Sequence, residues 1–161
     1  MQTIYYHSFK IEQHNYLLGA TSNGLAFVGS QDGDVTELKQ FYPEAVLVDS
    51  KAQVNDYRVQ LEEYLQGVRK EFTIKQDITG TSFQEAVWQQ VAQIPYGQVS
   101  NYTKIAQAIN RPQAIRAVGT AIGKNPLLMV IPCHRVLTKT GKLGGYRGGL
   151  QMKQTLLNLE K

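Results

Sequence analysis

Residues 131–136 read IPCHRV and contain the one cysteine of the 161-residue chain. Pro132 restricts the backbone before Cys133, and His134 and Arg135 follow it directly. A histidine and an arginine beside a thiol favour its thiolate, which is the nucleophilic form. The motif therefore predicts a reactive cysteine at position 133.

The rest of the composition excludes several other kinds of site. One cysteine cannot form an intramolecular disulfide, and the three histidines are too scattered for a zinc spacing, so we expect His7 and His14 to be strand-surface or packing residues. The N-terminus lacks the apolar run of a secretion signal, and residues 127–131 are far shorter than the ~20 residues of a membrane helix. We expect a cytoplasmic protein with no metal, no cofactor and no membrane partner.

Charge divides the chain into two halves of opposite sign. Residues 1–72 carry six Lys or Arg against ten Asp or Glu, whereas residues 73–161 carry eleven against three. Such a basic half is an electrostatic footprint for nucleic acid, with a generic basic surface as the alternative. Nine basic residues and no carboxylate lie between Glu85 and Glu160: Lys104, Arg111, Arg116, Lys124, Arg135, Lys139, Lys142, Arg147 and Lys153.

Residues 1–72 have the pattern of an α/β domain. The runs YLLGAT and LAFVGS flank Asn23 and Gly24, two residues that tolerate positive φ, which predicts a hairpin. The run AVLVDS predicts a further strand. Apolar residues at three- and four-residue steps over 54–68 then predict an amphipathic helix.

Residues 73–80 are the expected connector, because they end in polar residues and glycine. The helix that follows is expected to begin with a Ser-x-x-Glu capping box at Ser82 and Glu85. Trp88 lies on the apolar face of that helix, so we expect it in the core rather than stacked on a base. This helix opens the second domain, residues 81–161.

Two short helices within residues 100–110 and 112–125 are separated by Arg-Pro, which predicts a helix-turn-helix. In the second helix, Ile115, Val118 and Ile122 form the expected buried stripe, leaving Gln113, Arg116 and Thr120 near the opposite face. Small residues would let this helix lie close to a nucleic-acid groove or, equally, to another helix: Ala117, Gly119, Ala121 and Gly123.

The remaining segments complete a mostly α-helical second domain. Residues 127–131 predict a short buried strand that leads into the cysteine motif, and residues 139–142 predict a turn. The glycine-rich loop GGYRGG, at 144–149, lets backbone approach a ligand. A helix over 150–160 ends the chain.

The run SNYTKIAQAIN through GKLGGYRGGL resembles the alkylguanine-DNA alkyltransferases, also called methylated-DNA-protein-cysteine methyltransferases. The motif Pro-Cys-His-Arg-Val, preceded by Arg-Ala-Val-Gly and Asn-Pro, carries the resemblance, which covers residues 82–160. The resemblance implies a ribonuclease H-like α/β N-terminal domain and a mostly α C-terminal domain with a winged helix-turn-helix.

The resemblance also implies an activity, which is DNA repair by direct damage reversal. A member of this family flips O6-alkylguanine out of duplex DNA and transfers the alkyl group irreversibly to its own cysteine, so that each molecule acts once. Action on O4-alkylthymine is left open. We expect a monomer whose partner is double-stranded DNA, with cooperative assembly on DNA also left open.

Five residues match the family's reaction machinery. Cys133 matches the alkyl acceptor, His134 the base that deprotonates it through a water, and Glu160 the carboxylate that orients this histidine. Asn125 matches the residue whose turn supports the thiol. Tyr102 matches the tyrosine that rotates a backbone phosphate and donates a proton toward the departing guanine.

Further residues match the family's lesion and DNA contacts. Arg116 matches the arginine that enters the duplex in place of the extruded nucleotide. Val136, Tyr146 and Gly148 match the pocket that holds the flipped base. The remaining expected DNA contacts are Gln113, Ala117, Gly119, Thr120 and Arg135.

The sequence departs from the family pattern at Asn101, where serine is common, and it lacks the cysteines that bind zinc in some members. Two other functions would use part of the same residue set. An alkyltransferase-like protein that only binds lesions would replace the acceptor cysteine, so Cys133 argues against it. A cysteine hydrolase would also use Cys, His and an acid, but it would not need a basic helix-turn-helix.

Overall fold

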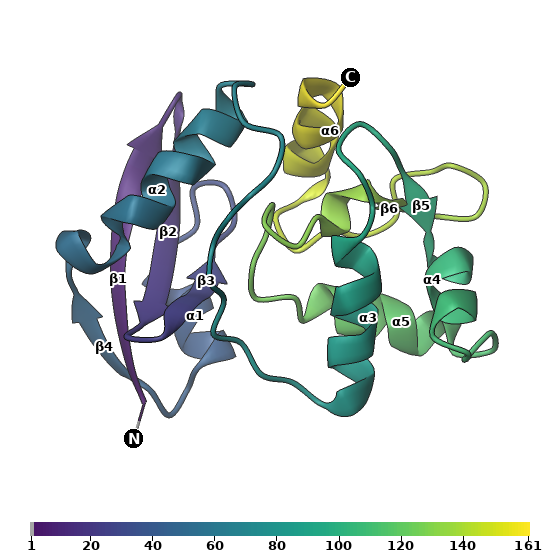
Figure 1. The fold of residues 1–161 in the computed structure, drawn as a ribbon, viewed down its shortest axis with the longest axis horizontal. Coiled ribbons are helices and arrows are strands. Elements are labelled where there is room, and N and C mark those ends of the chain that lie inside the picture. The colour runs from purple at the N-terminus through teal and green to yellow at the C-terminus, as the bar shows by residue number, and fades with distance from the viewer. Residues whose placement is uncertain (1) are drawn as a thin grey trace. The chain divides into compact units, whose positions relative to one another are not determined.

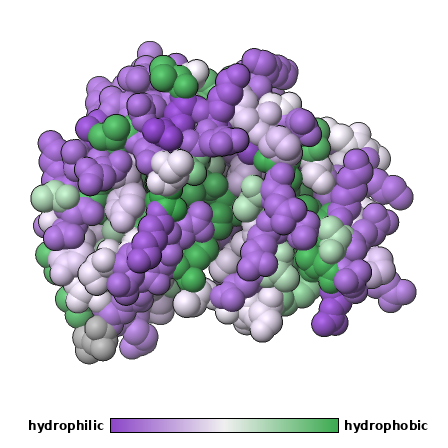
Figure 2. Space-filling view, viewed as in Figure 1, coloured by the Kyte–Doolittle hydropathy of each residue, from purple (hydrophilic) through white to green (hydrophobic). Residues whose placement is uncertain are grey.

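The computed structural model describes residues 2–161, which separate between Ile78 and Thr79 into two compact units (Figure 1). The first unit is acidic and the second is basic. Polar side chains cover most of the face shown in Figure 2. None of the helices within residues 2–161 is long and apolar enough to cross a membrane.

The first unit is built on a four-stranded mixed sheet in the order β3-β2-β1-β4. β1 pairs antiparallel with β2, and β2 with β3, whereas β4 joins the other edge of β1 in parallel. A parallel neighbour needs a crossover, which here contains helix α1. The elements are β1 Thr3–Ile11, β2 His14–Thr21, β3 Gly24–Val28, α1 Val35–Phe41, β4 Val46–Asp49 and α2 Lys51–Leu65.

The predicted hairpin is confirmed as β2 and β3, but its turn differs from the prediction. Neither Asn23 nor Gly24 adopts positive φ. Gly24 is required for space instead, because a Cβ there would lie 2.7 Å from the carbonyl oxygen of Lys75. Residues 75–77, inside the predicted connector, pair with Leu25 and so cover the outer edge of β3.

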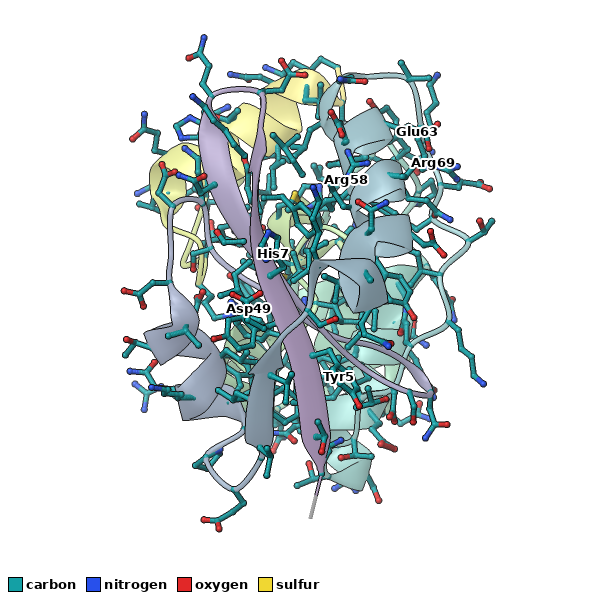
Figure 3. All side chains as sticks on the ribbon, turned by 90° about the vertical axis from the view of Figure 1, so that its left-hand side faces the viewer. Tyr5, His7, Asp49, Arg58, Glu63 and Arg69 are labelled. Atoms are coloured by element: carbon teal, nitrogen blue, oxygen red, sulfur yellow. The ribbon has the colours of Figure 1, made fainter. Side chains whose placement is uncertain are left out.

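Helix α2 confirms the predicted amphipathic pattern and packs against β1 and β2 (Figure 1). Val54, Leu61 and Tyr64 are buried, whereas Val68 lies beyond the helix end and is exposed. On the sheet, His7 lies on β1 beside Asp49 of β4, and its Nδ1 is 2.8 Å from the Asp49 carboxylate (Figure 3). This position matches the predicted strand-surface role of His7.

The second unit consists of short helices around two short parallel strands. Trp88 is buried, as predicted, and its indole N–H donates to the carbonyl of Ala121 at 2.9 Å, which ties α3 to α5. The elements are α3 Ser82–Ala92, β5 Ser100–Asn101, α4 Tyr102–Ala108, α5 Ile115–Gly123, the 3₁₀ turn η1 Cys133–Arg135, β6 Val136–Leu137 and α6 Leu150–Leu159.

The two helices predicted for the helix-turn-helix are present as α4 and α5, which pack against each other. Asn101 caps α4 by accepting a hydrogen bond from the Lys104 N–H, so the departure from serine keeps a good N-cap. The predicted stripe of α5 is wrong at Ile115, which is exposed at the first helical position. Ala121 joins Val118 and Ile122 in the buried face instead.

The capping box of α3 lies one residue before its predicted place. Thr81 Oγ1 accepts from the Gln84 N–H, and the Gln84 side chain accepts from the Thr81 N–H. Ser82 is therefore the first residue of the helix rather than its cap. Two overlapping Ser/Thr-x-x-Gln/Glu patterns occur here, and the sequence pattern alone does not choose between them.

Thr81→Ala should lower the free energy of unfolding by about 1 kcal/mol, because the first turn of α3 loses its cap. Ser82→Ala is the matched control and should change it by less than about 0.5 kcal/mol. Chemical denaturation of both variants decides the register. Equal losses in the two variants would contradict this assignment.

Candidate functional site

Cys133 begins the one-turn helix η1 and is buried. The side chain of Asn125 organises the preceding segment: its Oδ1 accepts from the Leu127 N–H at 2.9 Å, and its Nδ2 donates to the Ile131 carbonyl at 3.0 Å. The same Nδ2 lies 3.3 Å from Cys133 Sγ. One buried amide thus fixes both the approach to the cysteine and the sulfur atom.

The strand predicted over residues 127–131 is wrong. The segment forms a tight buried turn in which Ile131 N–H donates to the Leu127 carbonyl and Met129 adopts φ of 71°. Asn125 satisfies the backbone groups that a neighbouring strand would otherwise bond. A short apolar run indicates burial but does not separate a strand from a buried turn.

The fold brings His134 and Glu160 together, although 26 positions separate them in the sequence. Glu160 lies just after α6 with its side chain almost fully buried, and its Oε2 is 2.7 Å from His134 Nε2. The carboxylate therefore fixes the orientation of the imidazole ring. Glu160 is part of the interior, not a frayed terminal acid.

Arg135, predicted to contact DNA, does not lie on the surface. Its guanidinium donates to both Glu160 oxygens, at 2.8 and 2.9 Å, and to the Ile94 carbonyl at 2.6 Å. It also lies over the Tyr96 ring. A buried carboxylate needs a paired cation, and the structure uses Arg135 for that purpose.

Electrostatics at the sulfur differ from the prediction that His134 and Arg135 favour the thiolate. Burial raises the pKa of the Cys133 thiol above its ordinary value. The groups that lower this pKa are the Asn125 amide and two cations distant in sequence, Arg147 and Lys153. The resting residue is therefore a protonated thiol, and these groups offset part of the cost of ionising it.

Burial also shifts the two neighbouring titratable side chains. It lowers the pKa of His134, and the bond to Glu160 partly opposes that effect. It raises the pKa of Tyr102, and negative charge on Cys133 raises it further. At neutral pH the site therefore holds a neutral imidazole and a neutral phenol, which can exchange protons with a reacting group.

A pocket of about 250 Å³ opens onto Cys133. Its lining includes Tyr146, which was predicted for the base pocket, and adds residues that sequence reasoning missed, among them Ile122 and Gly145. The full lining is Tyr102, Gly119, Ile122, Gly123, Cys133, Gly145, Tyr146 and Arg147.

The other two predicted pocket residues, Val136 and Gly148, are not part of the lining. Val136 is fully buried, and its carbonyl accepts a hydrogen bond from Lys153. A Cβ at Gly148 would lie 2.4 Å from Met152 Sδ and 2.8 Å from a ring carbon of Tyr146. Gly148 thus allows the Tyr146 ring to lie against α6.

The predicted DNA contacts lie on the exposed side of α5 and just before it. Gln113 precedes the helix rather than lying on it, and is exposed. Arg116, Ala117 and Thr120 are exposed on α5. Gly119 is half-buried and belongs to both this surface and the pocket lining, so the exposed helix face adjoins the pocket.

Known proteins resemble the chain along its whole length. Residues 82–161 match the family model described as the DNA-binding domain of 6-O-methylguanine DNA methyltransferase. The inducible methylated-DNA--protein-cysteine methyltransferase of Bacillus subtilis is 45% identical over 99% of this chain and 91% of its own length. The chain belongs to the methylated-DNA--protein-cysteine methyltransferase family. A relative with the same description from Methanosarcina acetivorans is 38% identical over 98% of each chain.

Solved structures of this family share the two-domain alkyltransferase fold. Mycobacterium tuberculosis OGT in complex with DNA superimposes with a TM-score of 0.81 at 34% identity, over 98% of this chain and 92% of that one. The Methanococcus jannaschii O6-methylguanine DNA methyltransferase superimposes with a TM-score of 0.67 at 26% identity, over 96% of this chain and 92% of that one.

Within residues 2–161, no group of three or more His, Cys, Asp and Glu side chains could hold a metal ion.

Glu160→Gln should slow alkylation of Cys133 and shift its pH profile upward. Glu160 raises the pKa of His134, so without the carboxylate the imidazolium formed when the thiol ionises loses its main stabilisation. The variant should also lose about 3 kcal/mol of stability, because Arg135 becomes a buried charge without its partner. Single-turnover rates against pH, taken below the unfolding temperature, measure the first effect.

Gln151→Ala, an exposed change on the same helix, is the control and should match the wild type. A folded Glu160→Gln protein with an unchanged rate and pH profile would show that the carboxylate has no part in activating the thiol.

Proposed function

We propose that this protein repairs DNA by direct reversal, transferring an alkyl group from O6 of guanine to Cys133 Sγ. The observation that carries the proposal is the pocket that ends on a single buried cysteine, supported by Asn125 and adjacent to the His134–Glu160 pair. The methyltransferase names of its relatives and the DNA complex of the M. tuberculosis protein support it.

In the proposed reaction the thiolate attacks the saturated carbon bound to O6. The S–C bond forms as the C–O bond breaks, and the electron pair leaves with guanine, which takes up a proton. A polarisable sulfur is well suited to this displacement, and no metal or cofactor is required. O4-alkylthymine carries the same kind of carbon and is a second candidate lesion.

His134 is proposed to receive the thiol proton by way of a water. With Nε2–H donating to Glu160, Nδ1 is the basic nitrogen of the neutral ring. The carboxylate then stabilises the imidazolium that forms. Tyr102 lines the pocket as a neutral phenol and is the proposed proton donor to the departing guanine.

The lesion must leave the base stack before the thiol can reach it. We propose that Arg116, exposed on α5, enters the duplex and offsets the few kcal/mol of unstacking. Tyr102, Gln113, Ala117, Gly119 and Thr120 are the proposed backbone and groove contacts. Tyr146 is the proposed wall of the base pocket, with Gly148 and Val136 supporting it from behind.

The proposal also assigns a fold type to each of the two units. We assign the first unit to a ribonuclease H-like α/β domain over 1–72 and the second to a winged helix-turn-helix domain over 81–161, joined through 73–80. The reading helix pair is α4 and α5. The proposed working state is a monomer on double-stranded DNA in the cytoplasm, where a free thiol is kept reduced.

Each protein molecule should repair one lesion. The product is a thioether, whose alkyl group no ordinary step in the site removes, so the acceptor is consumed. After incubation with excess duplex carrying one methylated guanine, the peptide containing Cys133 should be heavier by one methyl group. Repaired DNA should plateau at one equivalent of protein.

Cys133→Ser is the control for this experiment. It should abolish transfer but bind the same duplex with wild-type affinity, because the exposed face of α5 is unchanged. Repair that continues beyond one equivalent, or a methyl group found on another residue, would refute the proposal.

Arg116→Ala should slow repair of duplex lesions by about tenfold or more, because the flipped state loses its inserted side chain. The reaction with free O6-benzylguanine, which needs no flipping, should keep its wild-type rate. Comparing the two substrates in single-turnover assays isolates the duplex-dependent step.

Arg111→Ala removes the same charge from the exposed segment before α5 and serves as the matched control. It should weaken binding at low salt without changing the ratio of the two rates. If Arg116→Ala slows the free base as much as the duplex, then Arg116 does not act through the duplex.

A further inference from the structure

Lys153 is a charged residue that lies fully buried on the inner side of α6. Lys153 is one of the nine basic residues from which the sequence predicts a nucleic-acid footprint, but it is not on the surface. Its ammonium donates to the carbonyls of Val136 at 2.7 Å, Gly145 at 3.1 Å and Leu143. Three neutral acceptors thus surround one buried positive charge.

These three carbonyls come from the two segments that form the site. Val136 directly follows the turn η1 that holds Cys133. Leu143 and Gly145 belong to the loop that brings Gly145 and Tyr146 to the pocket. One side chain therefore joins α6, the cysteine turn and the pocket wall.

A buried ammonium is a costly way to fill this space. Burial lowers the pKa of Lys153 from 10.5 to about 8. An apolar side chain of similar length would avoid this desolvation, although it would leave three carbonyls unbonded. A charge retained at this cost suggests a use for the charge itself.

The charge of Lys153 acts on the Cys133 thiol. Lys153 and Cys133 attract each other when both are ionised: the cation lowers the pKa of the thiol, and the thiolate raises that of the lysine. Arg147 has the same sign of effect on Cys133. Lys153 differs from Arg147 in being fully buried, although both donate hydrogen bonds to backbone carbonyls.

We infer that Lys153 is a positioning residue of the transfer reaction, whose charge both fixes the pocket wall against the cysteine turn and stabilises the thiolate that attacks the lesion. The inference rests on the function proposed above. It assigns Lys153 no contact with the substrate. It predicts that the positive charge, and not only the volume of the side chain, sets the reactivity of Cys133.

The test uses Lys153→Met, which keeps the volume but removes the charge and the donors, and Lys153→Gln, which keeps donors without the charge. Lys39→Met, at an exposed lysine of α1 in the first unit, also removes one lysine charge and is the matched control. Iodoacetamide is the probe of the thiol, since this chain has one cysteine. Mass measurement then gives the rate of Cys133 modification at each pH.

In both Lys153 variants the ionisation of Cys133 should move to higher pH, and methyl transfer from duplex DNA near neutral pH should fall by about tenfold. Lys39→Met should behave as the wild type in both assays. A purely structural lysine would lower the unfolding temperature without moving the thiol titration. Folded variants with the wild-type titration and rate would overturn the inference.

The iodoacetamide assay needs no DNA, so it separates this inference from the proposed function. A wild-type protein that fails to take a methyl group from DNA refutes the function. An unmoved thiol titration in folded variants refutes the role of Lys153.

If neither variant folds, the pH dependence of the wild type decides. The other ionisable groups around the site are Cys133, His134, the Arg135–Glu160 pair, Tyr102 and Arg147. The reactive pair is an ionised thiol beside a charged lysine, so transfer should pass through a maximum and fall at high pH, where both groups have lost their protons. A rate that rises to a plateau without an alkaline fall in the folded protein would overturn the inference.

Discussion

Burial of a thiol that must ionise is the constraint on which the rest of the second unit depends. Removing Cys133 from water favours its neutral form, and only compensating groups can make the thiolate accessible. An amide on the sulfur and two cations supply that compensation. The advantage of burial is that the thiol sits at the end of a pocket and its charge, once formed, is poorly screened.

The same constraint explains why so many charged groups lie inside a small unit. Glu160 is needed beside His134, but a carboxylate that serves only a neutral imidazole would be an uncompensated buried charge. Arg135 neutralises it through two hydrogen bonds and is anchored in turn by the Ile94 carbonyl. The two residues after the cysteine therefore have different roles: His134 is the proposed base of the reaction, and Arg135 neutralises the carboxylate of Glu160.

Sequence reasoning succeeded where a local pattern has one structural outcome. The hairpin, the amphipathic α2, the buried Trp88 and the final helix follow from periodicity and turn residues. The pairing of His134 with Glu160 followed from family resemblance, because nothing local links residues 26 positions apart. Strand β1 and helix α1 were not predicted. For β1 the reason is that its pairing with β2 and β4, which involves residues distant in sequence, defines it as a strand.

The sequence also did not predict whether a charged side chain points to the surface or into the interior. Arg135 and Lys153 look like surface cations because long basic residues are rarely buried, and the signals that reverse this prior are partners distant in sequence. For Arg135 the partner is Glu160, and for Lys153 it is a set of backbone carbonyls, which leave no trace in the residue types. A carboxylate-poor segment predicts positive charge without saying on which side of the fold it lies.

This distinction changes the electrostatic footprint on DNA. Of the nine cations between Glu85 and Glu160, Arg135 and Lys153 are buried and Arg147 lines the pocket. Six remain exposed: Lys104, Arg111, Arg116, Lys124, Lys139 and Lys142. Since each neutralised phosphate adds about −0.9 to the slope of log affinity against log salt, the exposed set of this interval limits its contribution to about −5. In the proposed function, the positive charge of the second unit thus has two roles: the exposed cations attract the DNA backbone, and the buried cations favour ionisation of one thiol.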